Sequence, residues 1–156
     1  MDTWDPILTG VVTLPDGRLV RGRALRRGDP GDDNAPEFGL YLTGKPHDEP
    51  RWESRWVCWP DFRLPRSSSE AVDALMDAYD RSAKARVEIA CGGGAGRTGT
   101  AIAILARCAG IPAQDAVAWV RANYRPTAAE TPWQRRFVER VTLCLLYTSD
   151  AADERS

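Results

Sequence analysis

The sequence predicts an α/β domain in which a central mixed sheet is flanked by helices. Three observations lead to this fold class: strand-like segments come first, a strand–glycine loop–helix unit follows them, and helical segments fill the remainder. The chain has 156 residues, which is enough for one domain with a hydrophobic core. We therefore expect a single domain over residues 1–143.

Strand-like segments occupy the first sixty residues or so. A Pro-Asp-Gly turn joins residues 10–14 to residues 18–25 and predicts a hairpin. Two further short strands are predicted over residues 38–42 and 52–59, on either side of a stretch rich in proline and glycine. Residues 26–37, which are rich in Gly, Pro and Asp, are expected to form a loop.

Helical signals dominate the second half of the chain. A capping box that begins at Ser67 predicts a helix over residues 68–84. The largely apolar residues 98–108 predict a second helix. Two more helices are expected to begin near Pro112 and after Thr131, where a proline follows the N-cap.

The composition argues against several functional classes. The formal net charge is −1, so no basic surface indicates binding to nucleic acid or to an anionic membrane. No apolar run approaches the roughly 20 residues of a membrane span, and the acidic N-terminal segment lacks a secretory signal, so we expect a cytoplasmic protein. The four cysteines form no CxxC pair, which argues against a zinc site. Only Lys45 and Lys84 among the 21 basic residues are lysine, a bias that suggests a bacterial source.

Residues 144–156 are expected to lie outside the domain. They resemble the translated sequence of a transposon adapter used in sequencing libraries, and helical patterning ends near Leu146. We therefore expect an adapter-derived tail that is not native and is excluded from the functional site.

A glycine-rich turn after a short strand carries the residues expected to do chemistry. Residues 87–90 predict a strand that delivers Cys91 into the turn, and a helix follows at once. Glycines let the backbone turn its N–H groups toward an anion, and the N-terminal end of the helix adds positive charge. The same field stabilises a thiolate, while the guanidinium of Arg97 is suited to hold two phosphate oxygens. The expected substrate-binding residues are Gly92, Gly93, Gly94, Ala95, Gly96 and Arg97.

This segment resembles the C-x5-R signature of the protein tyrosine and dual-specificity phosphatases, in its fuller form C-x-[AG]-G-x-G-R-[ST]. Gly94 and Gly96 stand at the positions of the signature glycines, and Thr98 takes the hydroxyl position after the arginine. The resemblance implies a phosphatase-like fold with the signature loop between a strand and a helix. It also implies that Cys91 is the nucleophile, that Arg97 clamps the phosphate, and that Thr98 helps the thiolate to leave in the second step.

The tripeptide Trp59-Pro60-Asp61 lies upstream of the cysteine and is the second candidate segment. Cleavage of a phosphate ester needs a general acid near the loop, because the departing oxygen is a poor leaving group unless it is protonated. The tripeptide resembles the mobile Trp-Pro-Asp loop of the same family, which implies that Asp61 is this acid. The alternative interpretation is a strand end with a buried Trp59.

Gln134 is the third candidate. In tyrosine phosphatases of this superfamily, a glutamine after the signature helices positions the water that hydrolyses the phosphocysteine, and residues 133–137 loosely resemble that segment. Gln134 also stands three residues after Thr131, which is the spacing of a capping box and explains the residue without catalysis. Both interpretations are open at this point.

The expected function is hydrolysis of a phosphomonoester through a phosphocysteine intermediate, with no cofactor and no metal. The alternative is a catalytically weak phosphate- or phosphoprotein-binding module, because the family usually has His before the cysteine and this chain has Ala90. A nucleotide-binding phosphate loop is disfavoured, since it would need Gly at position 91 and Lys at position 97. Arsenate reductases related to low-molecular-weight phosphatases place the cysteine before the acid, the reverse of the order in this chain.

The expected substrate is a phosphorylated protein or a small phosphomonoester, with no nucleic-acid and no membrane partner. The variable loop positions Gly92, Gly93 and Ala95 carry no lysine. Enzymes of this superfamily that act on polyphosphorylated inositides often place basic residues there, so the sequence favours other substrates. The one histidine, His47, lies in a loop rich in Pro and Asp and is expected to be solvated rather than catalytic.

Overall fold

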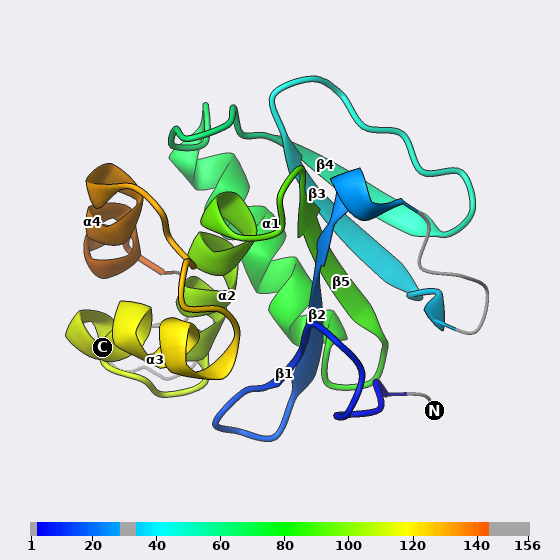
Figure 1. Cartoon of the computed structure of the whole chain (residues 1–156), viewed down its shortest axis with the longest axis horizontal. Helices are drawn as coiled ribbons and strands as arrows, with labels where there is room; N and C mark the ends of the chain where they lie inside the picture. The colour runs from blue at the N-terminus through cyan, green and yellow to red at the C-terminus, as the bar shows by residue number, and fades with distance from the viewer. Residues whose placement is uncertain (1–2, 29–33, 144–156) are drawn as a thin grey trace, which may run out of the picture.

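A computed structural model of the chain describes residues 3–28 and 34–143. Within these ranges, five strands form one mixed sheet in the order β1-β2-β5-β3-β4, and four α-helices gather on one side of it (Figure 1). The predicted α/β class with a central mixed sheet is confirmed. The tail expected over residues 144–156 lies outside the described residues.

The sheet is mostly parallel. β1 (Val11–Thr13) pairs antiparallel with β2 (Leu19–Ala24), which is the hairpin that the turn predicts. β5 (Val87–Cys91) lies parallel between β2 and β3 (Phe38–Thr43), and β4 (Glu53–Cys58) runs parallel to β3 at the edge. Four parallel strands therefore end at the same edge of the sheet, although they come from distant parts of the chain.

The helices begin at the capping signals in the sequence, with some differences in extent. α1 (Ser68–Arg81) starts after its N-cap Ser67 and ends three residues before the predicted end. α2 (Gly96–Cys108) starts two residues earlier than predicted, inside the glycine-rich turn. Pro112 does not open α3 (Ala116–Asn123) directly, because a short 3-10 turn comes between them. α4 (Pro132–Arg140) has Pro132 at its first position, as predicted.

The main hydrophobic core lies between the sheet and the helices α1 and α2. Side chains alternate along β5, so Val87 and Ile89 join the core while Glu88 points to the opposite face. α2 is buried along most of its length because α3 and α4 pack around it. No helix in the described ranges is both long and apolar enough to cross a bilayer.

The opposite face of the sheet carries a buried polar network. Glu88 is fully buried and pairs with Arg21 and, at 2.7 Å and 2.9 Å, with Arg23. The hydroxyl of Tyr41 donates to the same carboxylate at 2.9 Å. His47, which we expected to be solvated, is partly buried and stacks on Tyr41 with ring centroids 4.4 Å apart. This histidine therefore belongs to the packing of the second face.

Candidate active site

The glycine-rich turn lies at the edge where the parallel strands end. β5 ends at Cys91 and α2 begins at Gly96, so the turn joins them directly. Ligands of open α/β sheets bind at this position, outside the carboxyl ends of the strands. Cys91 is 1% exposed, and its Sγ accepts a hydrogen bond from the N–H of Gly94 at 3.2 Å. The sulfur therefore lies beneath the turn and in contact with one of its amides.

Three carbonyls of the turn are held by groups outside it. The carbonyls of residues 92, 93 and 94 accept hydrogen bonds, in that order, from the backbone N–H of Arg26 at 3.0 Å, from Nη1 of Arg125 at 3.1 Å and from the hydroxyl of Tyr124. The described residues contain no cis peptide bond, and in a trans peptide the N–H points away from the C=O. The amides of residues 93, 94 and 95 therefore point away from these outer partners, and the Gly94 amide meets Sγ.

The hydroxyl of Tyr124 donates a hydrogen bond to the turn and keeps its proton at physiological pH. Burial raises the pKa of Tyr124, although the neighbouring Arg125 guanidinium opposes the shift. The hydroxyl therefore stays protonated at all physiological pH values and keeps its bond to the carbonyl of Gly94. This contact holds the turn at Gly94 against the C-terminal end of α3.

Gly94 is required by the geometry of the turn. Its φ is +72°, a conformation that side chains disfavour. A Cβ at this position would also lie 2.9 Å from the backbone nitrogen of Ala24, at the end of β2. The turn thus packs directly on the neighbouring strand.

Arg97 lies in the first turn of α2 and its guanidinium is almost fully buried. Nη1 donates to the carbonyls of Leu42 and Trp59, at 3.1 Å and 3.0 Å, which lie at the ends of β3 and β4. Nη2 lies 3.2 Å from Oδ1 of Asp61. The guanidinium therefore points along the carboxyl edge of the sheet and connects the turn to the segment that carries Asp61.

Asp61 follows β4 and lies at the mouth of the turn. Its carboxylate is bracketed by two cations, Arg97 on Oδ1 and Arg26 on Oδ2, the latter at 3.5 Å. Trp59 is fully buried, as the alternative interpretation of this segment expected, and its Nε1 donates to the carbonyl of Arg63 at 2.8 Å. A buried Trp59 and an Asp61 paired with Arg97 are thus compatible features of one loop.

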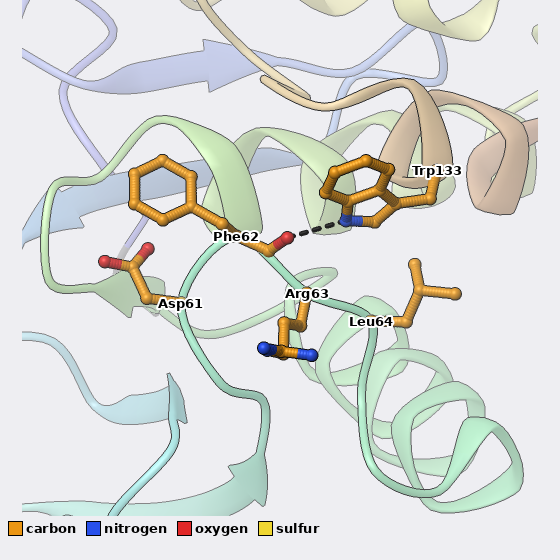
Figure 2. A pocket seen from close by; sticks show the side chains of 5 residues that line it. All are labelled: Asp61, Phe62, Arg63, Leu64 and Trp133. Atoms are coloured by element: carbon orange, nitrogen blue, oxygen red, sulfur yellow. Dashed lines mark hydrogen bonds between the residues drawn. The ribbon is translucent and has the colours of Figure 1, made fainter.

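A pocket of about 590 Å³ opens beside Asp61 (Figure 2). Phe62 and Trp133 border it, and both side chains are about half exposed. The indole Nε1 of Trp133 donates to the carbonyl of Phe62 at 2.6 Å, which ties α4 to the Asp61 segment. The carboxylate of Asp61 therefore has the turn on one side and an aromatic pocket on the other.

Thr98 follows Arg97 in the first turn of α2. The Thr98 hydroxyl is buried and has no hydrogen-bond partner among the described residues. A buried hydroxyl without a partner costs roughly 1–3 kcal/mol.

Gln134 forms the capping box that its spacing predicts. Its Oε1 accepts from the N–H of Thr131, and its own N–H donates to the hydroxyl of Thr131, both at 3.2 Å. Its Nε2 also donates to the carbonyl of Arg63 at 3.2 Å, so the amide holds the Asp61 segment as well. The role of Gln134 in positioning water stays a prediction.

Three charged residues at the turn are not predicted from the sequence, and one of them is Arg125, which donates to the carbonyl of Gly93. Arg26 lies over Gly92 and Gly93, and a carboxylate oxygen of Glu130 lies so close to Gly96 that a Cβ there would come within 2.4 Å of it. None of the three belongs to a recognisable motif. Arg26 stands 65 positions before Cys91 in an arginine-rich chain, so only the pairing of β2 with β5 brings it to the site.

Comparisons with known proteins find similarity in both sequence and fold. Residues 64–142, slightly more than half of the chain, match the family described as Swiss Army Knife protein, DSP-PTPase phosphatase domain (PTP-SAK). The chain is also 36% identical over 80 residues to the uncharacterized protein MJ0215 of Methanocaldococcus jannaschii. That alignment covers 50% of this chain and 48% of MJ0215, so the similarity spans about half of either protein.

The fold is similar to that of a solved phosphatase structure. The crystal structure of Tk-PTP in the active form matches with a TM-score of 0.61 at 24% sequence identity, over 83% of this chain and 97% of that chain. The crystal structure of Tk-PTP in the G95A mutant form matches with a TM-score of 0.60 at 25% identity, over 80% and 89% of the two chains. The first of these similarities shows the fold alone.

Proposed function

Because the chain belongs to the Swiss Army Knife family of DSP-PTPase phosphatase domains, we propose that it hydrolyses phosphoric monoesters through a phosphocysteine intermediate on Cys91. One observation supports this most directly: the sulfur under the amides of the turn, the buried Arg97 and the carboxylate of Asp61 meet at one edge of the sheet. Family membership suggests phosphatase activity, and the roles of the individual residues are our proposal.

In the first proposed step, the Cys91 thiolate attacks phosphorus and the bond between phosphorus and the ester oxygen breaks. The amides of the turn and the guanidinium of Arg97 bind the equatorial oxygens, where negative charge is spread in the transition state. The carboxyl group of Asp61 donates its proton to the departing oxygen, which leaves as an alcohol or phenol. The products of this step are the phosphocysteine and an ionised Asp61.

In the second proposed step, the Asp61 carboxylate takes a proton from a water molecule that attacks phosphorus. The sulfur–phosphorus bond breaks, inorganic phosphate is released and the thiolate is regenerated. The unpartnered hydroxyl of Thr98 supplies a hydrogen bond to the departing sulfur. Gln134, at the start of α4, is proposed to position the water.

The pocket beside Asp61 is the proposed site for the leaving group. Phe62 and Trp133 offer two aromatic surfaces next to the carboxyl that must reach the ester oxygen. Aromatic rings pack on one another in offset or edge-to-face arrangements, so an aryl ester fits this side of the site. The pocket therefore favours an aryl phosphate, including a phosphotyrosine side chain, as the first substrate to test.

The test compares two substrates whose leaving groups differ in acidity, phenyl phosphate and p-nitrophenyl phosphate. We expect Cys91→Ser to reduce kcat by at least about a thousandfold on both substrates, because the nucleophile is lost. Asp61→Asn should reduce kcat by about a hundredfold on phenyl phosphate and by much less on p-nitrophenyl phosphate, whose leaving group needs little protonation.

Two control variants keep the test specific. Burial raises the pKa of Cys108 to about 12, so its thiol is unreactive and Cys108→Ser should leave kcat unchanged. Asp48→Asn removes an exposed carboxylate away from the turn and should also have no effect. Equal losses for Asp61→Asn on the two substrates would contradict the role of general acid.

The second candidate function is a phosphate- or phosphoprotein-binding module without efficient turnover. Ala90 favours it, because this fully buried residue offers the loop no side-chain hydrogen bond. Calorimetric titration with inorganic phosphate, together with the assay above, separates the two functions. Phosphate binding without turnover of either aryl ester between pH 5 and pH 8 would support the binding module and contradict the enzyme.

A further inference from the structure

The second cation at the turn, Arg26, has a setting unlike that of Arg97. Its backbone N–H is bonded to the carbonyl of Gly92 at 3.0 Å, which anchors the residue just after β2. A Cβ on Gly92 would lie 3.5 Å from both Nε and Nη2 of Arg26, and a Cβ on Gly93 would lie 3.6 Å from Nη1. The guanidinium therefore lies along the first half of the turn, yet 71% of the side chain is exposed.

The two arginines share one carboxylate but face different surroundings. Arg97 is buried against the carbonyls of β3 and β4, and it is placed to hold an anion at the bottom of the turn. Arg26 reaches Asp61 from the solvent side and has no other anionic partner among the described residues. The rim of the site thus carries a guanidinium that is both fixed at its backbone and open to a ligand.

The charge around the turn is asymmetric. Arg26 and Arg125 both contact the segment formed by Gly92 and Gly93, whereas the carboxylate of Glu130 lies against Gly96 at the other end. A second anion next to the bound phosphate would be attracted to the first end and repelled from the second. A second negative charge on the substrate is therefore expected to lie at the end of the turn formed by Gly92 and Gly93.

The proposed chemistry also removes the partner of Arg26 during binding. When Asp61 acts as the acid it is a neutral carboxyl group, which no longer forms an ion pair with a guanidinium. Arg26 then loses its ion pair with Asp61 and lies beside the bound ester. A second carboxylate or phosphate group on the substrate would replace the lost ion pair through charge-assisted hydrogen bonds to Arg26.

We propose that Arg26 is a specificity residue that selects phosphomonoesters with a second anionic group close to the scissile phosphate; this inference rests on the proposed function. The absence of lysine from the variable positions of the turn had pointed away from polyanionic substrates. The positive charge comes instead from Arg26, the second residue after the adjacent strand β2.

The test compares phenyl phosphate with 3-carboxyphenyl phosphate at constant ionic strength, since exposed charges are screened by salt. Arg26→Gln should lower the ratio of kcat/KM for the carboxylated ester to that for phenyl phosphate by about tenfold, mainly through KM, as expected for one charge-assisted hydrogen bond. Lys84→Gln is the matched control, because it removes the same charge at an exposed position before β5 begins, and its ratio should equal that of the wild type. An equal loss on both esters, or no loss, would overturn the proposal.

A binding measurement separates failure of this proposal from failure of the proposed function. In a Cys91→Ser background, calorimetry measures Kd for inorganic phosphate and for methylenediphosphonate, which carries two anionic groups and is not hydrolysed. Loss of the preference for methylenediphosphonate on Arg26→Gln supports the subsite even if the wild type turns over neither ester. Turnover of phenyl phosphate together with an unchanged preference refutes the subsite and leaves the phosphatase function in place.

Discussion

At the scale of single residues, Gly94 combines two constraints that can be separated by experiment. Ala at this position would adopt the left-handed backbone at a cost of about 1–2 kcal/mol and would also press on the backbone of Ala24. We expect Gly94→Ala to lower kcat/KM for phenyl phosphate by at least about tenfold, because the amide that contacts the Cys91 sulfur must move. Thermal unfolding and steady-state kinetics measure the two effects.

Gly17 provides the matched control for this prediction. It has a φ of +96° in the β1–β2 turn, and no heavy atom lies within 4 Å of the position that a Cβ would take. Gly17→Ala should therefore lower stability by the backbone strain alone, about 1–2 kcal/mol, while kcat/KM stays at the wild-type value. Similar kinetic losses in both variants would show that the contact of Gly94 with Ala24 is unimportant.

Local sequence patterns predicted the residues of the turn but not those at its rim. The glycines between Cys91 and Arg97 predict a tight turn, because glycine adopts positive φ values that other residues disfavour. Arg26 has no such signal, since an arginine after a strand is common in a chain with this composition. His47 was misjudged for a related reason: its loop composition indicated exposure, and only the fold brings it onto Tyr41.

At the scale of elements, the start of α4 is joined to the Asp61 segment by side-chain hydrogen bonds. Gln134 closes the capping box with Thr131 and also donates to the carbonyl of Arg63. We expect Gln134→Ala to destabilise the protein by about 1–3 kcal/mol, because buried polar groups lose their partners. If Gln134 also positions water, hydrolysis of the phosphocysteine slows, and stopped-flow traces show a burst of p-nitrophenol followed by slow turnover.

Thr131→Ala is the control for the element-scale prediction. It removes the other half of the capping box and should lower stability by about 0.5–2 kcal/mol, but it leaves the Gln134 amide in place. We expect no burst from this variant. A Gln134→Ala protein that is destabilised and shows no burst either would assign Gln134 to capping alone.

Element boundaries were predictable where a capping residue marks them. Ser67 and Thr131 cap α1 and α4 through hydrogen bonds to residues three positions further on. Such capping residues can be recognised in the sequence by their type and spacing. The start of α2 was predicted two residues late, because Gly96 has low helix propensity and is held in the helix by its surroundings. The parallel pairing of β5 between β2 and β3 depends on long-range contacts, and no local pattern encodes it.

At the scale of the whole molecule, the polar network on the second face of the sheet joins three strands. Glu88 on β5 is the shared acceptor for Arg21 and Arg23 on β2 and for Tyr41 on β3. We expect Glu88→Gln to lower the free energy of unfolding by about 3–5 kcal/mol, because two buried guanidinium groups lose their counter-charge. Urea denaturation should show a lower midpoint with an unchanged m-value.

The surface pair between Glu53 and Arg81 provides the comparison for this effect. The Glu53 side chain is 62% exposed, so water and salt screen its interaction with Arg81 at 2.8 Å. Glu53→Gln should therefore leave the urea midpoint almost unchanged. Comparable small shifts for both variants would mean that the Glu88 network does not stabilise the fold.

The Cys91 sulfur lies at the end of β5, whereas the Arg26 guanidinium belongs to the segment that follows the neighbouring strand β2. Two positions of the glycine turn tolerate little change, because a Cβ on Gly94 would lie 2.9 Å from the nitrogen of Ala24 and a Cβ on Gly96 would lie within 2.4 Å of Glu130. The position after β2 is solvent-facing, and its anchoring contact with the turn uses only main-chain atoms. If the proposed function holds, substitutions at position 26 change the substrate preference and leave the turn that binds the phosphate intact.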